Sequence, residues 1–348
     1  KPDAVKAGHI GAILAKINEL KSYLQMPRDV VITTHRNPDG DALGSSLGLY
    51  HYLLRNGHAV KIICPSEYPL FFSWMPGVED MIIYDSEPER AEQLLSEAEM
   101  IFCLDFNSLE RIDKVGEYIA KLNNCRLAMI DHHLYPDIQA DFEISKPSAS
   151  STCELVYDFL ESLGDLDQVD TIVGECLMTG ILTDTGSFKY STSPRLFKVV
   201  AGLIERGVDD YKLQDLLFNS QEEKHLRLLG HCLNNRMEII KEYKAGIIYL
   251  NRHDYERFDI QRGDTEGIVN FLLKMREVKV AAFITEQPTI VKISLRSKGE
   301  ISVQEIARKH FKGGGHKNAA GGSSYKSLRS TVQKFKEVLA EYKTVLQD

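Results

Sequence analysis

The sequence lacks the features that identify membrane proteins and secreted proteins. Its 348 residues contain no uncharged apolar run of about 18 residues, roughly the length that a membrane-spanning helix requires. The N-terminus begins Lys-Pro-Asp and continues as an amphipathic stretch, without the apolar core of a signal peptide. We therefore expect a soluble cytoplasmic protein that does not bind a membrane, although a sequence beginning with Lys leaves a removed leader open.

Paired cysteines and an excess of positive charge are also missing. The six cysteines form no C-x-x-C pair, and most lie in apolar runs, a pattern typical of reduced core residues in a reducing compartment. Asp and Glu number 50 against 42 Lys and Arg, so the formal net charge is -8. Binding to long nucleic acid depends on many Lys and Arg contacts with phosphates. The charge argues against long duplex nucleic acid as a partner, and any polyanionic substrate should be short.

Apolar runs of strand length alternate with helical segments in the first part of the chain. Residues 4–25 carry apolar side chains at helical spacing, which predicts a leading helix packed on the first domain. The strand-length runs that follow lie at 30–34, 59–64, 81–84, 100–104 and 126–130. Strands that alternate with helices in this way predict a parallel sheet covered by helices on both faces.

The rest of the chain predicts a second, smaller α/β domain. A helical pattern up to residue 220 completes the first domain, and a charged, helix-prone stretch follows. A new alternation then predicts strands at 246–250, 278–285 and 289–295, and helices near 265–275, 302–310 and 327–347. The length and the 43% hydrophobic content suffice for two cores. The predicted α/β fold therefore has a larger domain at 1–210, a helical connector at 211–240 and a smaller domain at 241–348.

The first chemical signal is a His-x-x-x-Asp-x-Asp sequence directly after the first predicted strand. It places His35, Asp39 and Asp41 in a loop before a helix that starts near residue 42. Ligands of open α/β sheets bind beyond the carboxyl ends of the strands, so these side chains lie where chemistry is expected. Taken alone, the pattern also fits an N-cap Asp beside a surface His.

Two later strands end in the same kinds of residue. Asp105 follows the run 100–104, and the triplet Asp131-His132-His133 follows the run 126–130. A single Asp at such a place is often a turn former or a helix cap, and a pair of His residues is often structural. Three strand ends that bring Asp and His to one edge of a sheet instead indicate a shared site.

Asp184 extends this set, although it follows an apolar helical stretch at 172–182 and could simply end that helix. Two adjacent divalent cations need oxygen and imidazole ligands with a bridging carboxylate, and such a pair activates water and neutralises phosphoryl charge. The candidate ligands are His35, Asp39, Asp41, Asp105, His132 and Asp184. Without thiolates this set favours manganese, with magnesium as the alternative, over structural zinc. One cation plus a structural Asp is the simpler interpretation.

A glycine-rich stretch near the C-terminus is the last candidate. Glycine lets backbone amides approach a phosphate closely, and neighbouring Arg and His side chains add charge-assisted hydrogen bonds. A glycine triplet can also be a flexible loop. The predicted substrate-binding residues are Arg296, Ser297, Gly313, Gly314, Gly315, His316 and Asn318.

Together these motifs resemble the DHH phosphoesterases, a family named after the triplet found here at 131–133. The four motifs of that family occur in order. The Gly-Gly-Gly-His and Asn-Ala-Ala-Gly-Gly stretch is similar to the DHH-associated domain of the first type, present in RecJ-like exonucleases and nano-RNases. The length and the Ser-Leu-Arg-Ser segment resemble the nano-RNase branch, and the resemblance covers nearly the whole chain.

The resemblance implies a two-domain enzyme with its active site in the cleft between the domains. It implies that Asp105 bridges two metal ions, one held with His35 and Asp39 and the other with Asp41, His132 and Asp184. Asp131 would orient the metal-binding loop, and His133 would face the scissile phosphate. Arg296 and His316 would bind the terminal nucleotide. Water activated by the metals would attack phosphorus without a covalent intermediate.

The implied substrates are RNA oligomers a few nucleotides long, and often 3′-phosphoadenosine 5′-phosphate. The main alternative is hydrolysis of cyclic dinucleotides or their linear products, which usually involves attached sensory and membrane segments. Family II inorganic pyrophosphatases fit less well because they lack the Gly-Gly-Gly-His loop. A nucleotide-binding module without catalysis conflicts with the complete ligand set. The oligomeric state, including a homodimer, is left open.

Overall fold

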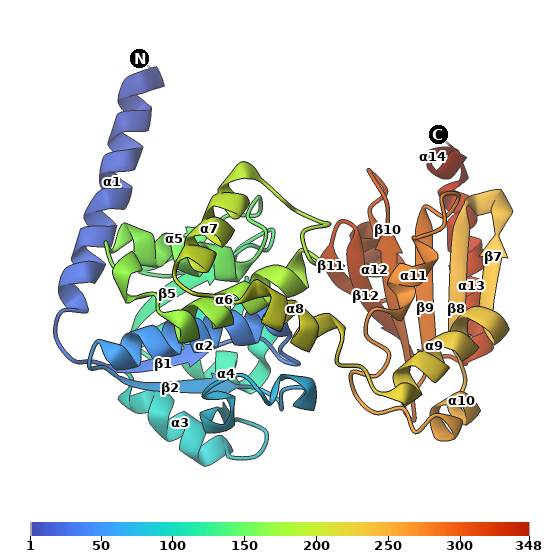
Figure 1. Ribbon diagram of the computed structural model, residues 1–348, viewed down its shortest axis with the longest axis horizontal. Helices are drawn as coiled ribbons and strands as arrows, with labels where there is room; N and C mark the ends of the chain where they lie inside the picture. The colour runs from blue at the N-terminus through green and yellow to red at the C-terminus, as the bar shows by residue number, and fades with distance from the viewer. Residues whose placement is uncertain (1, 348) are drawn as a thin grey trace. The chain divides into compact units, whose positions relative to one another are not determined.

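The structure is a computed structural model that describes the backbone of residues 2–347 and the side chains of residues 11–347. The chain divides into two compact units, residues 1–220 and residues 221–348, each with its own sheet (Figure 1). Each unit also has its own hydrophobic core. Among the described residues, no helix combines the length and the apolar character needed to span a bilayer.

The first unit is built on a six-stranded parallel sheet in the order β3-β2-β1-β4-β5-β6. Its strands are β1 (Asp29–Thr33), β2 (Ala59–Cys64), β3 (Ile82–Ile83), β4 (Met100–Leu104), β5 (Arg126–Asp131) and β6 (Phe142–Ser145). The chain moves outward from β1 to β3, returns to the centre and moves outward in the other direction from β4 to β6. The strand order therefore reverses between β1 and β4, the place where open α/β sheets form a crevice at their carboxyl ends.

Helices cover both faces of this sheet, as alternate residues of β1 show. Val30 and Ile32 pack in one cluster with residues of α2, α5 and α6, whereas Val31 packs in a separate cluster with residues of α3 and α4. Continuously apolar strands are typical of parallel sheets buried on both faces. The predicted fold class is confirmed. The helices are α1 (Pro2–Tyr23), α2 (Gly40–Arg55), α3 (Pro88–Glu97), α4 (Asp113–Ala120), α5 (Thr152–Ser162), α6 (Thr171–Asp184), α7 (Pro194–Glu205) and α8 (Asp210–Phe218).

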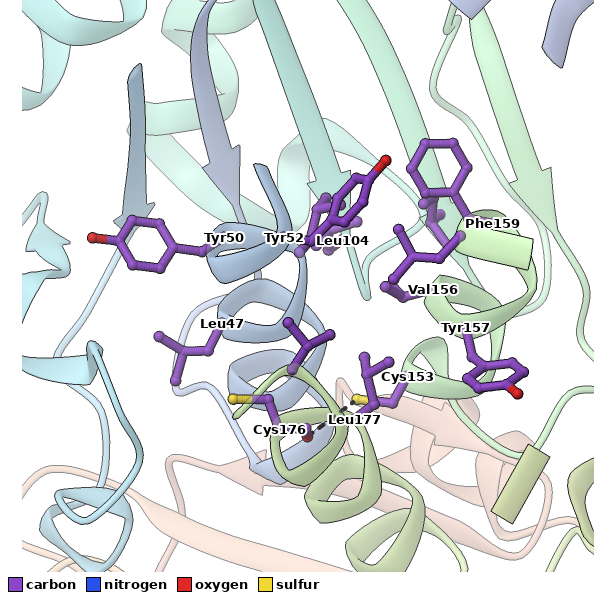
Figure 2. Close-up of a cluster of buried hydrophobic side chains, with 14 of the residues drawn as sticks. Leu47, Tyr50, Tyr52, Leu104, Cys153, Val156, Tyr157, Phe159, Cys176 and Leu177 are labelled. Atoms are coloured by element: carbon purple, nitrogen blue, oxygen red, sulfur yellow. Dashed lines mark hydrogen bonds between the residues drawn. The ribbon is translucent and has the colours of Figure 1, made fainter. Parts of the chain in front are cut away.

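Helices α2, α5 and α6 pack closely on one another beside the sheet (Figure 2). Leu47 of α2 and Cys153 of α5 are fully buried there, and the Cys153 thiol faces the carbonyl of Cys176 in α6. A Cβ atom at Gly44 of α2 would lie 2.4 Å from that same carbonyl, so glycine permits the close approach of α2 and α6. All six cysteines are free thiols, and all except Cys125 are buried, as the sequence predicts.

The leading helix is only partly packed. Near its C-terminal end Leu20 joins the core of the first unit, but Ile13 and Leu14 are exposed. The side chains before residue 11, including Val5 and Ile10, lie outside the described residues. The short edge strand β6 is a further difference, because its apolar and polar residues alternate over only four positions, the shortest alternation that indicates a strand.

The second unit is built on a mixed sheet in the order β11-β12-β10-β9-β8-β7, in which only β8 and β9 are paired in parallel. Its strands are β7 (Met237–Ile240), β8 (Ala245–Leu250), β9 (Val280–Glu286), β10 (Val291–Ser297), β11 (Gly314–His316) and β12 (Ala319–Ser324). Ala282 and Ile293 pack with residues of α12 and α13 on one face, and Ala281 and Phe283 pack with residues of α9 and α11 on the other. Its helices are α9 (Glu223–Asn235), α10 (Arg252–Arg257), α11 (Ile268–Leu272), α12 (Val303–His310), α13 (Leu328–Glu341) and α14 (Lys343–Gln347).

Two features of the second unit differ from the sequence-based expectation. The glycine-rich stretch is an antiparallel hairpin of β11 and β12, since strand pairing with β10 orders residues whose composition suggests a loop. The predicted helical connector at 211–240 is divided between the units. Helix α8 lies before the boundary at residue 220, whereas α9 and the strand β7 lie after it, and β7 pairs with β8.

Candidate metal centre

Asp and His side chains gather at the carboxyl ends of β1, β4 and β5 in the first unit. Asp39 and Asp41 lie in and after the loop that leaves β1, Asp105 directly follows β4, and His132 directly follows β5. Because β1 and β4 are neighbours in the sheet, residues about 70 positions apart in the chain meet there. Asp184, the last residue of α6, lies beside them.

The first group of candidate ligands consists of His35, Asp39 and Asp105. The Nε2 atom of His35 lies 3.3 Å from Asp105 Oδ2 and 3.7 Å from Asp39 Oδ1. His35 Nδ1 lies 2.8 Å from the carbonyl oxygen of Arg36. Since a carbonyl only accepts, Nδ1 carries a proton and Nε2 is the nitrogen turned towards the carboxylates.

The second group consists of Asp41, His132 and Asp184. His132 Nε2 lies 3.3 Å from Asp184 Oδ2 and 3.6 Å from Asp41 Oδ2. It also lies 3.6 Å from Asp105 Oδ1, so the two oxygens of Asp105 face the two groups. One ligand atom from each member of either group lies within 4.8 Å of the others in that group.

Local backbone geometry supports this convergence. Asp105 is almost fully buried and has a φ of 65°, a left-handed conformation that is unusual for a residue other than glycine. Such strain is typical of residues whose direction is imposed by a functional site. Gly40 permits α2 to start against α6, since a Cβ atom there would lie 2.5 Å from Thr183 Oγ1.

The alternative role of Asp39 as a helix cap coexists with its place in the cluster. Its Oδ1 accepts a hydrogen bond of 2.9 Å from the backbone N–H of Ala42, and it is the N-cap of α2. The same oxygen faces His35. The cap therefore fixes the direction of this carboxylate, and the two sequence-based interpretations do not exclude each other.

Burial, together with the crowding of carboxylates, shifts the pKa values of this cluster. Burial raises the pKa of Asp41 well above its usual range, and repulsion from Asp105 and Asp184 adds to that rise. Burial also raises the pKa of Asp184 to about 6, although His132 opposes the shift. Asp105 is held below its usual pKa because contact with the imidazoles, above all His35, outweighs the effect of burial.

The pKa values of the imidazoles rise as well, against the effect of burial. Burial lowers the pKa of His132, but its contact with Asp184 and the charges of the other carboxylates outweigh burial and raise it to about 9. His35 is raised well above its usual pKa because Asp105 and Asp39 outweigh burial in the same way. The cluster thus retains protons to balance its negative charge. Divalent cations can replace those protons, so the donor set fits carboxylate- and imidazole-bound metal ions.

The three residues of the triplet at 131–133 have different positions in the site. His132 belongs to the second ligand group, whereas Asp131 is fully buried and holds His133. Asp131 Oδ1 lies 2.6 Å from His133 Nδ1, and Asp131 Oδ2 accepts the backbone N–H of His133 at 3.1 Å. Both the ring and the backbone of His133 are therefore fixed by one carboxylate.

Sequence reasoning missed the contacts that the first residues of α5 make with the candidate ligands. The Thr152 hydroxyl donates to Asp105 Oδ1 at 3.0 Å, and the backbone N–H groups of Thr152 and Cys153 donate to Asp41 at 2.8 and 2.9 Å. The only local signal is Ser151, a good N-cap that marks where the helix begins. That signal does not reveal which carboxylates the helix start meets.

The predicted substrate-binding residues of the second unit separate into two kinds. The register places Arg296 opposite Ala319 and Ala319 opposite His316, so these three form one row across β10, β12 and β11. Directly paired residues point to the same face of a sheet, and Arg296 is half-buried while His316 is exposed.

Ser297 and Asn318 instead hold the sheet end together. Asn318 Nδ2 donates to Ser297 Oγ at 2.9 Å and to the carbonyl of Gly299 at 3.0 Å, while Ser297 Oγ donates to the carbonyl of Ile301. A Cβ atom at Gly313 would lie 1.8 Å from a backbone oxygen of the hairpin, whereas one at Gly314 would meet open space. Gly315 has a φ of 141°, which also requires glycine.

Comparison with known protein families divides the chain at similar places. Residues 29–181 match the DHH family, N-terminal domain, and residues 245–348 match the DHHA1 domain. The first match contains the loop after β1, the end of β4 and the triplet after β5. The second contains the row formed by Arg296, Ala319 and His316.

Individual relatives agree with these matches. The bifunctional oligoribonuclease and PAP phosphatase NrnA of Thermus thermophilus is 31% identical over 293 residues, which cover 84% of this chain and 83% of the relative. The cyclic-di-AMP phosphodiesterase PdeA of Listeria monocytogenes is 28% identical over 315 residues, which cover 86% of this chain and 46% of the relative. The crystal structure of an exopolyphosphatase-related protein from Bacteroides fragilis has a TM-score of 0.92 and 38% identity, covering 96% of this chain and 98% of that one.

Proposed function

This chain belongs to the DHH family, in the branch of the NrnA-type oligoribonucleases, and on that premise we propose that it hydrolyses very short RNA oligonucleotides to mononucleotides. We extend the proposal to the dephosphorylation of 3′-phosphoadenosine 5′-phosphate, an activity that the name of the Thermus relative includes. A reducing, cytoplasmic setting accords with six free thiols.

The observation that carries this proposal is the convergence of six candidate ligands at the strand-order reversal. Two groups of ligands meet there, and the oxygens of one carboxylate, Asp105, face both groups. Two-metal phosphoesterases need this arrangement, because paired cations stabilise both the attacking and the leaving oxygens of a phosphoryl group.

We assign two divalent cations to this centre, with Mn²⁺ preferred and Mg²⁺ as the alternative. His35, Asp39 and Asp105 would hold one ion, and Asp41, Asp105, His132 and Asp184 would hold the other. When bound, the ions would supply positive charge for the phosphoryl oxygens and lower the pKa of a water molecule. The donor set contains oxygen and imidazole nitrogen but no thiolate, which supports these metals over structural zinc.

His133 is the residue that we assign to the scissile phosphate. Asp131 engages its Nδ1, so this carboxylate selects the ring orientation and turns Nε2 to the opposite side. From that position the imidazole would donate a hydrogen bond to a phosphoryl oxygen or to the leaving oxygen. Asp131 would then act by orientation, as the carboxylate partner of a histidine does in other hydrolases.

We assign substrate capture to the second unit. Arg296 and His316 contribute a guanidinium and an imidazole to the row across β10, β12 and β11, and these groups suit the phosphate of a terminal nucleotide. Gly314 lies beside them on β11 and leaves space at its Cα. The net charge of -8 accords with a short substrate, since long nucleic acid would need many more cationic contacts.

Hydrolysis of cyclic dinucleotides is the second candidate, and the similarity to PdeA is the observation that favours it. The two activities share the same metal ligands, so the centre in the first unit does not discriminate between them. The difference must come from the way the nucleotide is held. A linear substrate presents a terminal phosphate for Arg296 and His316, whereas a cyclic dinucleotide has no terminus.

A direct assay separates these candidates. Purified protein with Mn²⁺ is incubated with a labelled dinucleotide, a pentanucleotide, a 24-mer, 3′-phosphoadenosine 5′-phosphate, a cyclic dinucleotide and pyrophosphate, and a parallel series contains EDTA. We expect the fastest release of mononucleotides from the shortest RNAs, and no turnover in EDTA. Equal or faster turnover of the 24-mer would refute the limit on substrate size. A cyclic dinucleotide as the best substrate would favour the second candidate.

A further inference from the structure

The segment from Ala149 to Glu154, here called the positioning segment, supplies no candidate metal ligand but contacts three of them. The Ala149 carbonyl lies 3.4 Å from His132 Nδ1. The Thr152 hydroxyl donates to Asp105, and the first two N–H groups of α5 donate to Asp41. Three ligands that follow three different strands along the chain therefore share one continuous support.

We propose that the positioning segment sets the geometry of the metal centre, and that Thr152 is the positioning residue for the carboxylate shared by the two ligand groups. This inference rests on the proposed metal-dependent function. It adds to that function a residue that acts through Asp105 and does not itself touch metal or substrate.

The contact with Asp41 explains how a fully buried carboxylate is kept in place. Both of its oxygens accept a backbone N–H, at 2.8 Å from Thr152 and 2.9 Å from Cys153. The first N–H groups of a helix have no partner within the helix and carry a partial positive charge. Each carboxylate oxygen keeps a second lone pair, so the helix start holds Asp41 without using up its capacity as a ligand.

The contact with Asp105 controls a rotation. Its Oδ2 faces His35 and its Oδ1 faces His132, an arrangement that holds only while the carboxylate plane stays in one orientation. The Thr152 hydroxyl donates to Oδ1 at 3.0 Å and so selects that orientation. Thr152 is fully buried, and water therefore cannot easily replace its hydroxyl.

The segment is itself held rigidly. Ser151 caps α5 by accepting the N–H of Glu154 at 3.1 Å, and the hydroxyl of Ser150 donates to the buried carboxylate of Glu154 at 2.9 Å. These bonds fix the turn that leads into the helix. A support of this kind orients ligands only if it is less mobile than they are, and side chains around metal ligands commonly have this role.

The decisive comparison isolates the hydroxyl of Thr152. Thr152→Val keeps the shape of the side chain and removes the donor, whereas Thr152→Ser keeps the donor. Thr152→Ala and Thr152→Ser differ only by the hydroxyl, which provides a second matched pair if the valine variant fails to fold. Thr331→Val is the control, because Thr331 is also buried and its hydroxyl donates to the carbonyl of Ser327 in the other unit.

Mn²⁺ binding to the metal-depleted proteins is measured by isothermal titration calorimetry and by electron paramagnetic resonance, together with thermal unfolding in EDTA. We expect Thr152→Val and Thr152→Ala to bind Mn²⁺ about tenfold more weakly than wild type, the lower end of the effect seen when partners of metal ligands are removed. Thr152→Ser and Thr331→Val should bind as wild type does. Unchanged affinity and an unchanged resonance spectrum in the valine and alanine variants would overturn the inference.

The same experiment keeps the inference separate from the proposed function. If wild-type protein binds no Mn²⁺ and cleaves no short RNA, the proposed function fails and the inference falls with it. If wild type binds Mn²⁺ and the valine variant loses only thermal stability, the function stands and Thr152 is merely a structural residue.

Discussion

Two buried histidine–aspartate clusters, one in each unit, show what separates a metal centre from a structural network. In the second unit, the Asp254 carboxylate accepts one hydrogen bond from His231 Nε2, at 2.8 Å, and two from the Arg236 guanidinium, at 2.8 and 2.9 Å. In the first unit, the carboxylates of the candidate centre face one another and imidazoles. Both clusters contain a His and an Asp that are buried.

The difference lies in the balance of charge. Asp254 is one carboxylate matched by one guanidinium, and it also accepts the backbone N–H of Asn251. The first cluster contains four carboxylates, at Asp39, Asp41, Asp105 and Asp184, and burial together with mutual repulsion raises the pKa values of Asp41 and Asp184. A buried network that balances its own charge is complete, whereas one that does not balance it is suited to cations.

The largest expected effect is on activity and comes from Asp105. Asp105→Asn removes the charge shared by the two ligand groups. Loss of a residue that only supports a metal ligand costs up to about 100-fold, so loss of this proposed ligand should lower kcat by more than that. Because contacts with the imidazoles favour the ionised form of Asp105 in the fold, the metal-free variant should also unfold at a lower temperature than the metal-free wild type. The measurement is steady-state turnover of a dinucleotide with Mn²⁺ and thermal unfolding in EDTA. A variant that keeps most of its activity would contradict the shared role.

The next effect is on stability and comes from Asp254. Asp254→Asn leaves Arg236 without its carboxylate partner in a buried network and should lower the free energy of unfolding by about 3 kcal/mol. Mn²⁺ binding should stay as in wild type, which is the reverse of the result for Asp105. Glu305→Gln is the control, because its pair with Lys309 is exposed and should contribute less than about 0.5 kcal/mol. Loss of metal binding in the Asp254 variant would remove the distinction between the clusters.

The two clusters should also contribute to the pH dependence of stability with opposite signs. In metal-free protein the pKa of Asp184 is raised to about 6, so its ionisation between its ordinary value and pH 6 disfavours the folded state. The pKa of His132 is raised to about 9, and the stability that it contributes in full below its ordinary value is lost as pH rises through 9. Both effects lower stability as pH rises.

Asp254 behaves in the opposite way. Burial tends to raise its pKa, but the hydrogen bond from Arg236 and the others around it lower the value below the ordinary range. Its contribution is therefore present above its ordinary pKa and lost as pH falls through the folded value. Calorimetry in EDTA from pH 4 to 9, on wild type and Asp254→Asn, should show a loss of stability towards high pH in both proteins. In a parallel series with Mn²⁺ in place of EDTA, that loss of stability should be smaller. A loss that Mn²⁺ does not change would count against the metal centre.

The smallest expected effect concerns two arginines of the second unit. Arg236 is committed to Asp254, whereas Arg296 donates to the neighbouring carbonyl of Leu295 and belongs to the row that we assign to substrate. Arg296→Ala should raise KM for a dinucleotide about tenfold, the loss expected for one charge-assisted hydrogen bond, with kcat nearly unchanged. Arg296→Lys should recover part of that affinity. A fall in kcat at constant KM would speak for a role in the chemical step.

The sequence alone predicted most of the helices and strands and the chemical identity of the candidate ligands. Apolar periodicity reports local burial, so β1, β4 and β5 were recognisable, and Asp105 and His132 stood out because they follow buried strands. The hairpin of β11 and β12 was not recognisable, because glycine-rich strands carry no apolar alternation. The roles of Ser297 and Asn318 at the sheet end were hidden for a different reason, because small polar residues look alike in a sequence whether they bind a ligand or a backbone.

Only the tertiary structure decided which residues meet. The order of strands in the sheet places β1 beside β4, and this pairing brings the loop after β1 to Asp105. The start of α5 reaches Asp41 across 111 positions of the chain. Side-chain patterns specify the local conformation of each segment, whereas the contacts between distant segments depend on how the sheet and its helices pack as a whole. For that reason the ligands could be named from the sequence, but the segment that positions them became visible only in the fold.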